Sequence, residues 1–133
     1  MKNNFEYLVG DRNISNQSML PYNDMVCDFL GDLSKELFLE SNSKDYPDVK
    51  TLAFWCRKQN IKNLKQKFYS SETRLGLGLV FHITPSNIPT NFAYSLIFGL
   101  ITGNSNIVKV PSQKFKQVEI ICNCIKKILK KKI

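Results

Sequence analysis

Residues 75–110, LGLGLVFHITPSNIPTNFAYSLIFGLITGNSNIVKV, decide the fold of this protein. The stretch opens with a nearly continuous apolar run, residues 75–83, which is the pattern of a strand buried on both faces of a parallel sheet. Residues 84–89 contain two prolines and an asparagine, so they predict a loop rather than a longer strand or an early helix. The loop is followed by a second regular segment.

After the loop, the sequence predicts a helix, a second strand and a last helix. Residues 91–102 predict a buried helix, which Gly103 and the Asn after it would close. Residues 106–110 predict a second short strand, and Pro111 turns the chain into a last helix. The last helix is expected to place these side chains inward: Val118, Ile121, Cys122, Ile125 and Leu129. Strand, loop, helix, strand, helix is a βαβα unit, which predicts the first half of a Rossmann-like nucleotide-binding domain.

The first amphipathic helix lies well before this unit. Asp24 is its N-cap candidate, and the Ser- and Asn-rich cluster at residues 41–45 breaks it. Its apolar residues recur at three-and-four spacing, which predicts one buried face. They are Val26, Phe29, Leu30, Leu33, Leu37 and Phe38.

Two further helices are predicted before the apolar run. Pro47 suits the first turn of a second helix. A third helix is expected at about residues 61–68, with Leu64 and Phe68 inward. The inner face of the second helix is expected to hold Val49, Leu52, Ala53 and Cys56.

These elements predict an α/β protein of two parts. Residues 1–70 form a mainly helical segment, and residues 71–133 form a partial nucleotide-binding domain. A sheet of two parallel strands cannot cover both of its own faces, so we expect the domain to be incomplete.

Asn87 is the first candidate functional residue. It lies in the loop after the first strand, and open α/β sheets bind their ligands at the carboxyl ends of the strands. Prolines two residues away on each side restrict the backbone and give the side-chain amide a defined direction. An amide N–H directed at a developing oxyanion is worth about 3–4 kcal/mol of barrier. The alternative is a turn asparagine that bonds its own backbone.

Lys109 is the second candidate. It sits near the carboxyl end of the second strand, among apolar neighbours. A lysine there either extends its amine to the sheet edge or reaches a bound anion or hydroxyl. The residues alone leave both interpretations open.

The span from Arg74 to Gln113 resembles the aldehyde dehydrogenase superfamily, in which a strand leads to a Pro-x-Asn-x-Pro loop, a helix, Gly-Asn, a short strand and Lys-Pro-Ser-Glu. The resemblance is stronger to the acyl-CoA reductase branch that supplies aldehyde in bacterial bioluminescence (LuxC-type). Members of that branch show His-Ile-x-Pro-Ser-Asn-x-Pro, which residues 82–89 match. The segments YPDV, from Tyr46, and AFWCR, from Ala53, also resemble it.

The resemblance implies a role for each matching residue. Asn87 matches the amide that helps to hold the thioester or aldehyde oxygen, and Lys109 matches the lysine that hydrogen-bonds the adenosine ribose. Ser112 and Gln113 match the positions that follow that lysine. The strand end and loop that run along the cofactor correspond to Ile83, Thr84, Pro85 and Ser86.

Gln113 bears on the choice of cofactor. Its position is commonly Glu in NAD-preferring relatives, where a carboxylate accepts from the ribose 2′-OH and repels a 2′-phosphate. Gln113, followed by Lys114, removes that repulsion. The resemblance therefore implies NADP as cofactor, with NAD as the alternative.

The resemblance also implies a reaction, the reduction of an acyl-CoA or acyl-protein thioester to an aldehyde by an NAD(P)H-dependent oxidoreductase. The family's cysteine nucleophile, its glutamate base and a Gly-rich turn lie further along the fold, and none of them follows in this sequence. We therefore expect an inactive N-terminal fragment, completed by a missing C-terminal part or by assembly into a homo-oligomer.

The cysteines and the single histidine are expected to be structural. Cys27, Cys56, Cys122 and Cys124 all lie in apolar helical segments, which predicts reduced thiols in a cytosolic protein. The spacing of the last two differs from that of a Cys-x-x-Cys motif, so we expect no metal site. His82 lies inside a strand and is interpreted as a packed, hydrogen-bonded side chain rather than a general base.

The charge distribution supports a second hypothesis. Residues 1–56 hold five basic and nine acidic residues, whereas residues 57–133 hold fourteen basic and two acidic ones. A basic half favours an anionic partner, so the alternative function is a non-catalytic binding module for nucleic acid or anionic lipid. Against it, no aromatic residues interleave with the lysines of the last helix. We therefore expect no nucleic-acid partner.

The sequence also bears on location. The first ten residues carry charges where a secretory signal would be apolar, and residues 93–101 are too short to span a bilayer, which takes about 20 residues. We therefore expect a cytoplasmic protein without a membrane span.

Overall fold

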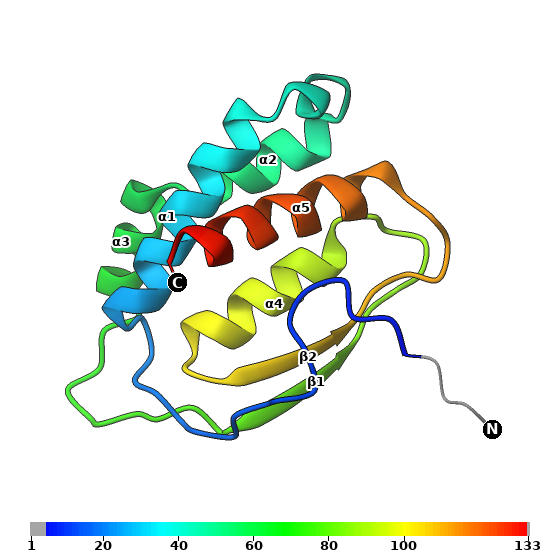
Figure 1. The fold of residues 1–133 in the computed structure, drawn as a ribbon. Helices are drawn as coiled ribbons and strands as arrows, with labels where there is room; N and C mark the ends of the chain where they lie inside the picture. The colour runs from blue at the N-terminus through cyan, green and yellow to red at the C-terminus, as the bar shows by residue number, and fades with distance from the viewer. Residues whose placement is uncertain (1–4, 133) are drawn as a thin grey trace.

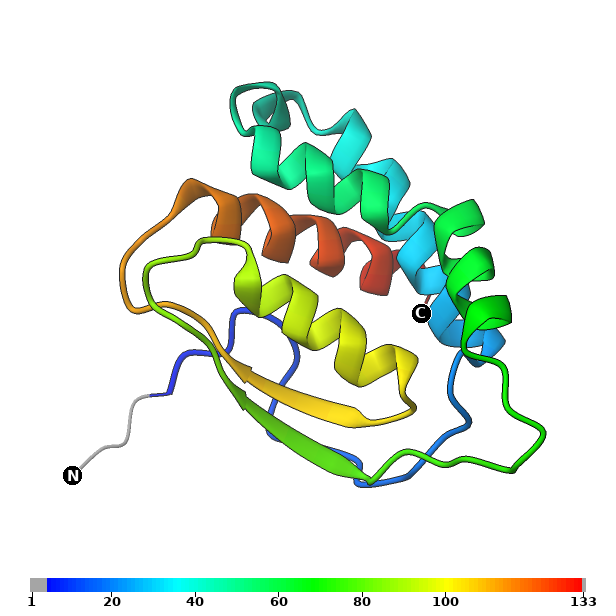
Figure 2. The same ribbon diagram turned by 180° about the vertical axis from the view of Figure 1, so that it is seen from behind.

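The computed structural model describes residues 5–132 and shows an α/β arrangement of helices stacked over a small parallel sheet (Figures 1 and 2). Both views place the helices on the same side of the sheet. The elements in chain order are α1 (Asp24–Leu39), the 3-10 helix η1 (Ser41–Asp45), α2 (Pro47–Trp55), α3 (Lys58–Lys67), β1 (Leu79–Ile83), α4 (Asn91–Ile101), β2 (Ser105–Lys109) and α5 (Lys116–Lys131).

The sheet consists of β1 and β2, which pair in parallel and in register from Leu79 opposite Ser105 to Ile83 opposite Lys109. Helix α4 connects the two strands and packs against both. The predicted order of strand, helix, strand and helix is therefore confirmed. The first strand is shorter than the apolar run that predicted it, and the second begins one residue earlier than expected.

Helix α4 ends where its sequence predicted. Gly103 adopts a φ of +88°, a left-handed conformation that favours glycine, and its N–H donates to the carbonyl of Leu100 at 3.0 Å. The next N–H, that of Asn104, donates to the carbonyl of Gly99 at 3.0 Å. Although α4 is strongly apolar, it has only 11 residues, and no helix within residues 5–132 is long and apolar enough to cross a membrane.

Helix α1 begins at Asp24, so its cap lies one residue earlier than predicted. Asn23, not Asp24, is the N-cap, and its side-chain oxygen accepts from the N–H of Val26 at 3.0 Å. The predicted apolar face is largely correct, but Phe38 is exposed because it lies outside the stripe that meets the neighbouring helices. The buried residues of α1 are Val26, Leu30, Leu33, Ser34 and Leu37.

Helices α2 and α3 follow the sequence pattern in part. Pro47 is the first residue of α2, and the four residues expected on its inner face are buried. In α3, Ile61 is buried and Leu64 half-buried, but Phe68 is 57% exposed, which contradicts its predicted inward position. Phe68 is the residue after the last turn of α3, so the helix no longer directs it at the core.

Helix α5 lies across the helical layer and packs against α1. Four of its predicted inward residues are buried, but Leu129 is 41% exposed and Ile128 is 2% exposed instead. Leu129 falls on the edge of the stripe, because the 3.6-residue period places residue 128 above Ile121 and Ile125. The core thus contains side chains from both halves of the chain.

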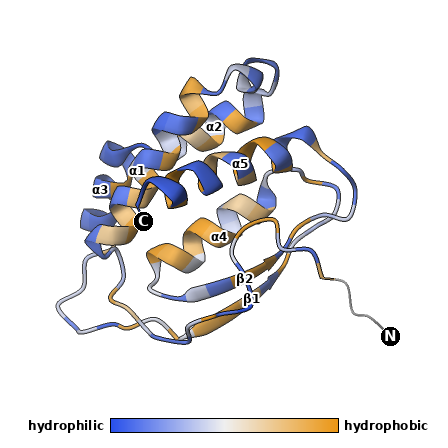
Figure 3. Ribbon diagram, in the orientation of Figure 1, coloured by the Kyte–Doolittle hydropathy of each residue, from blue (hydrophilic) through white to orange (hydrophobic). Residues whose placement is uncertain are grey.

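One face of the sheet is open, contrary to the expectation of a strand buried on both sides. Phe81 is 58% exposed and Leu77 is 90% exposed. Because all the helices lie on one side, only alternate residues of β1 point towards them. Figure 3 shows the apolar colouring of β1 at the edge of the molecule away from the helices. The exposed apolar residues of this stretch are Leu75, Leu77, Leu79, Phe81 and Ile83.

Candidate functional site

The carboxyl ends of β1 and β2 bring the predicted site residues to one edge of the molecule. Because the strands are parallel and Ile83 pairs with Lys109, the loop after β1 and the turn after β2 leave the sheet side by side. Helix α4 begins at Asn91, beyond the first of these connections, and α5 begins at Lys116, beyond the second. This edge is where open α/β sheets place their ligands.

The loop after β1 is held at its two ends. At the first end, the hydroxyl of Thr84 donates to the backbone carbonyl of Lys109 at 3.0 Å. At the other, the N–H of Asn91 donates to the carbonyl of Ile88 at 3.4 Å, and Thr90 is buried at the start of α4. Pro85 and Ser86 lie exposed between these ends.

Asn87 occupies the exposed tip of this loop. Within residues 5–132 its side chain makes no hydrogen bond, so the turn asparagine that bonds its own backbone is not what the structure shows. Its amide therefore keeps both N–H donors for a molecule outside the chain.

Lys109 lies on the open face of the sheet, at the last register position of β2. It is exposed, and its amine has no carboxylate partner in the described part of the chain. Ser112 and Gln113 follow it in an exposed turn, and the buried Pro111 anchors that turn. This edge thus carries the amine of Lys109, the hydroxyl of Ser112 and the side-chain amides of Gln113 and Asn87.

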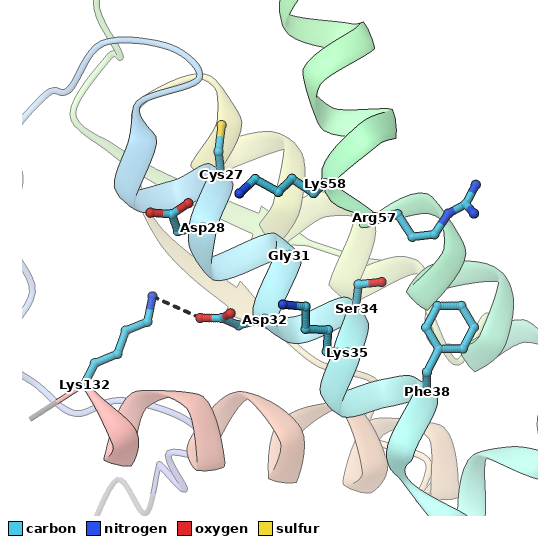
Figure 4. Close-up of a pocket in the computed structure, with 10 residues that line it drawn as sticks. All are labelled: Cys27, Asp28, Gly31, Asp32, Ser34, Lys35, Phe38, Arg57, Lys58 and Lys132. Carbon is cyan, nitrogen blue, oxygen red and sulfur yellow. Dashed lines mark ion pairs between the residues drawn. The ribbon is translucent and has the colours of Figure 1, made fainter.

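Two hollows of the surface lie away from this edge. One, of about 510 Å³, lies among α1, α3 and the end of α5, and Figure 4 shows the side chains around it. Its lining includes four cations and two carboxylates, of which Lys132 and Asp32 form an ion pair at 3.5 Å. Sequence reasoning did not identify this hollow, because its residues come from three helices and share no motif. Its mixed charges favour no single ligand chemistry.

His82 points away from the open face and forms a hydrogen bond between its Nε2 and the Oδ1 of Asn106, at 2.9 Å. The Nδ2 of Asn106 in turn donates to the carbonyl of Asn104 at 2.9 Å, so Oδ1 is the acceptor and the histidine ring donates. The interpretation of His82 as a packed, hydrogen-bonded residue is confirmed. Its bond joins β1 to β2 in the middle of the sheet.

The cysteines are poor nucleophiles. All four are free thiols, and all but the half-buried Cys27 are buried. Burial raises the pKa of Cys56 to about 12 and those of Cys122 and Cys124 to about 11. Burial also raises the pKa of Cys27, although Lys65 opposes the shift. A thiol attacks as its thiolate, so these environments suit packing rather than covalent catalysis.

We expect the raised thiol pKa values to weaken the fold at alkaline pH. In the unfolded chain the thiols of Cys56, Cys122 and Cys124 ionise near pH 9, whereas in the folded chain these three stay protonated to about pH 11 or 12. Their contribution is therefore complete below pH 9 and is lost as the pH rises towards 11–12, by about 1 kcal/mol for each thiol at pH 10. Urea unfolding at pH 8 and pH 10 measures this loss.

The control is the variant C122A/C124A. It retains every lysine and tyrosine, whose ionisation also changes stability, but lacks two of the thiols. Its stability should fall less between pH 8 and pH 10 than that of the unchanged chain. Equal losses in the two proteins would show that the thiols do not cause the effect.

The basic end of α5 is neutralised in part by α1. Lys127 lies 3.9 Å from a carboxylate oxygen of Glu40, Lys131 lies 2.6 Å from one of Glu36, and Lys132 lies 3.5 Å from one of Asp32. The hydrogen bond that Lys131 donates to Glu36 raises the pKa of Lys131. Three lysines counted for a nucleic-acid surface are therefore paired within the chain, which weighs against the binding-module hypothesis.

Comparison with known proteins places the chain in a family. The family model described as acyl-CoA reductase (LuxC) matches residues 55–128, which is more than half of the chain. The matched part includes α3, both strands, α4 and nearly all of α5. No curated protein and no solved structure matched the chain. Because the family model covers more than half of its length, the chain belongs to the LuxC acyl-CoA reductase family.

Proposed function

We propose that this chain forms the part of an acyl-CoA reductase that binds the nicotinamide nucleotide and orients the thioester. The proposed reaction converts a fatty acyl thioester, NADPH and a proton into an aldehyde, a free thiol and NADP⁺. The observation that supports it is that the loop of Asn87 and the strand end of Lys109 leave the sheet at the same carboxyl edge, inside the span that matches the family. The Rossmann-like interpretation of the βαβα unit is part of this proposal.

The residues at this edge fit an anionic nucleotide. Lys109 carries a positive charge with no carboxylate partner among the described residues, and Ser112 and Gln113 beside it are polar without negative charge. Lys109 would bind the adenosine ribose, and Gln113 would leave room for a 2′-phosphate. Reductases of this family generally use NADPH, which supplies the hydride when it is bound.

Asn87 would act on the thioester. Its amide N–H donates to the carbonyl oxygen, and this bond strengthens as negative charge develops there. Thr84, Pro85 and Ser86 would hold the loop along the nucleotide. This would place Asn87 at a fixed distance from the reacting carbon.

The four cysteines do not fit the role of attacking residue, because burial keeps them as thiols. We therefore infer that residues 1–133 alone form no aldehyde from a fatty acyl-CoA.

We also propose that the chain divides at residue 70 into a helical segment and a nucleotide-binding part. We further propose that the protein is cytoplasmic and that further protein completes the site.

Titration of the protein with NADPH, followed by NMR chemical shifts, tests the nucleotide site. We expect weak binding that perturbs the amides of residues 83–88 and 109–113. Replacing Lys109 with alanine should weaken binding at least fivefold. Replacing Lys126, an exposed lysine on α5, with alanine should leave it unchanged. Equal effects of the two substitutions would refute a specific site at the sheet edge.

A second comparison tests the role of Gln113. Replacing Gln113 with glutamate places a carboxylate where a 2′-phosphate would lie, so the preference should move from NADPH towards NADH. A ratio of the two dissociation constants that does not change would remove Gln113 from the site.

A further inference from the structure

Thr84 makes the last hydrogen bond between the two strands. The backbone register ends where Ile83 lies opposite Lys109. Pro85, two residues further on, has no N–H and cannot extend the ladder. Beyond the last register pair, the hydroxyl of Thr84 donates to the carbonyl of Lys109 at 3.0 Å. A side chain thus continues the pairing of β1 and β2 after the backbone pattern has ended.

The two partners of this bond belong to different parts of the proposed site. Thr84 begins the loop whose tip is Asn87, the amide proposed to hold the thioester oxygen. Lys109 is the residue proposed to bind the nucleotide ribose. We propose that Thr84 is a positioning residue, which fixes the loop of Asn87 relative to the strand end of Lys109. This inference rests on the proposed function of both residues.

The placement of the other side-chain bonds supports this role. The sheet has two further cross-strand side-chain bonds in the described residues: the N–H of Leu77 donates to Asn104 Oδ1 at 2.6 Å, and His82 bonds Asn106. The bond between Leu77 and Asn104 lies before the first paired residues of the strands, and the bond between His82 and Asn106 lies within the paired region. Only the bond of Thr84 lies at the carboxyl edge, where the site residues converge.

The other restraints on the loop within residues 5–132 are local. Pro85 and Pro89 fix their own φ angles, Ser86 and Asn87 form a turn, and the N–H of Asn91 donates to the carbonyl of Ile88. None of these restraints ties the loop to β2, as the hydroxyl of Thr84 does. Loss of the Thr84 hydroxyl should therefore loosen Ser86 and Asn87 and change the environment of the Lys109 carbonyl.

The test compares three variants of the 133-residue protein. Thr84→Val removes the hydroxyl but keeps the branched shape, and Thr84→Ser restores a hydroxyl without the methyl group. Thr102→Val is the matched control, because the Thr102 hydroxyl donates to the carbonyl of Phe98 at 2.8 Å, at the opposite end of α4. Thermal unfolding first establishes that each variant folds.

NMR supplies a readout independent of catalysis. In T84V we expect a changed carbonyl ¹³C shift of Lys109, lower order parameters for Ser86 and Asn87, and three- to fivefold weaker NADPH binding. T84S should retain the values of the unchanged chain. T102V should alter the end of α4 and the adjacent Asn104, whose Nδ2 donates to the Thr102 hydroxyl at 2.9 Å, but leave Ser86, Asn87 and the Lys109 carbonyl unchanged.

Each outcome decides the inference. An unchanged loop in T84V would overturn it, as would a loosened loop with unchanged NADPH affinity. A T84S protein that behaves like T84V would also overturn it, because the methyl group would then be what matters. If the unchanged chain does not bind NADPH, the proposed function fails, while the order of Ser86 and Asn87 in the three variants still shows whether Thr84 positions the loop.

Discussion

Replacing Gly99 with alanine is expected to lower the free energy of unfolding by about 2–4 kcal/mol, through overpacking and the loss of a partly buried hydrogen bond. Gly99 is buried in α4, and an added Cβ would lie 1.9 Å from the Oδ1 of Asn106. That side chain cannot move aside freely, because Oδ1 accepts from His82 and Nδ2 donates to the carbonyl of Asn104. Chemical denaturation measures the loss.

Gly31 offers a matched control inside another helix. An added Cβ there meets its nearest atom, the Cβ of Lys58, at 3.9 Å, which is ordinary contact. Gly31→Ala should therefore stabilise α1 by about 0.5–1 kcal/mol, since alanine is the better helix former. The two substitutions should have opposite signs. A stabilising effect of Gly99→Ala would show that α4 does not press on the Asn106 side chain.

Truncating Ile128 to alanine is expected to cost about 2–4 kcal/mol of stability, because it leaves a cavity in a packed core. Ile128 is 2% exposed and lies with Ile121 and Ile125 on the face that α5 turns inward. Leu129→Ala, at the next position of the same helix, should cost less than about 1 kcal/mol because the side chain is partly in water.

The pair tests the rotation of α5 about its axis. Both substitutions remove aliphatic atoms from the last two turns of one helix, so differences in helix propensity contribute little. Denaturation midpoints under one set of conditions give the comparison. A larger loss for Leu129 would mean that α5 is turned by one residue relative to the structure.

The sequence predicted the order and type of the elements around β1 and β2, because local signals sufficed. Gly103 closes α4 and Pro47 opens α2, and both act through backbone conformation within one turn. The predictions failed where the burial of a residue depends on which helices pack over the sheet. The apolar run from Leu75 has the pattern of a doubly buried strand, but periodicity does not say whether helices cover a second face.

The site was predictable in topology and not in detail. Parallel strands place their carboxyl ends together, so Asn87 and Lys109 were expected at one edge and lie there. The bond between Thr84 and the Lys109 carbonyl has no sequence signal, since it joins residues 25 apart. The same holds for His82 and Asn106, whose pairing depends on register.

The pairing of α1 with α5 has a consequence for the order of folding. The bond between Glu36 and Lys131 joins residues 95 positions apart, and the side of α1 that faces α5 gains its partner only when the chain has closed a loop of that size. Such distant contacts carry a loop-closure entropy cost and slow the search for the native topology. During synthesis, apolar residues of α1 would stay in contact with water or with chaperones until the lysine-rich helix leaves the ribosome. The opposite charges of the two helices would then guide their encounter, so refolding should slow as salt is added.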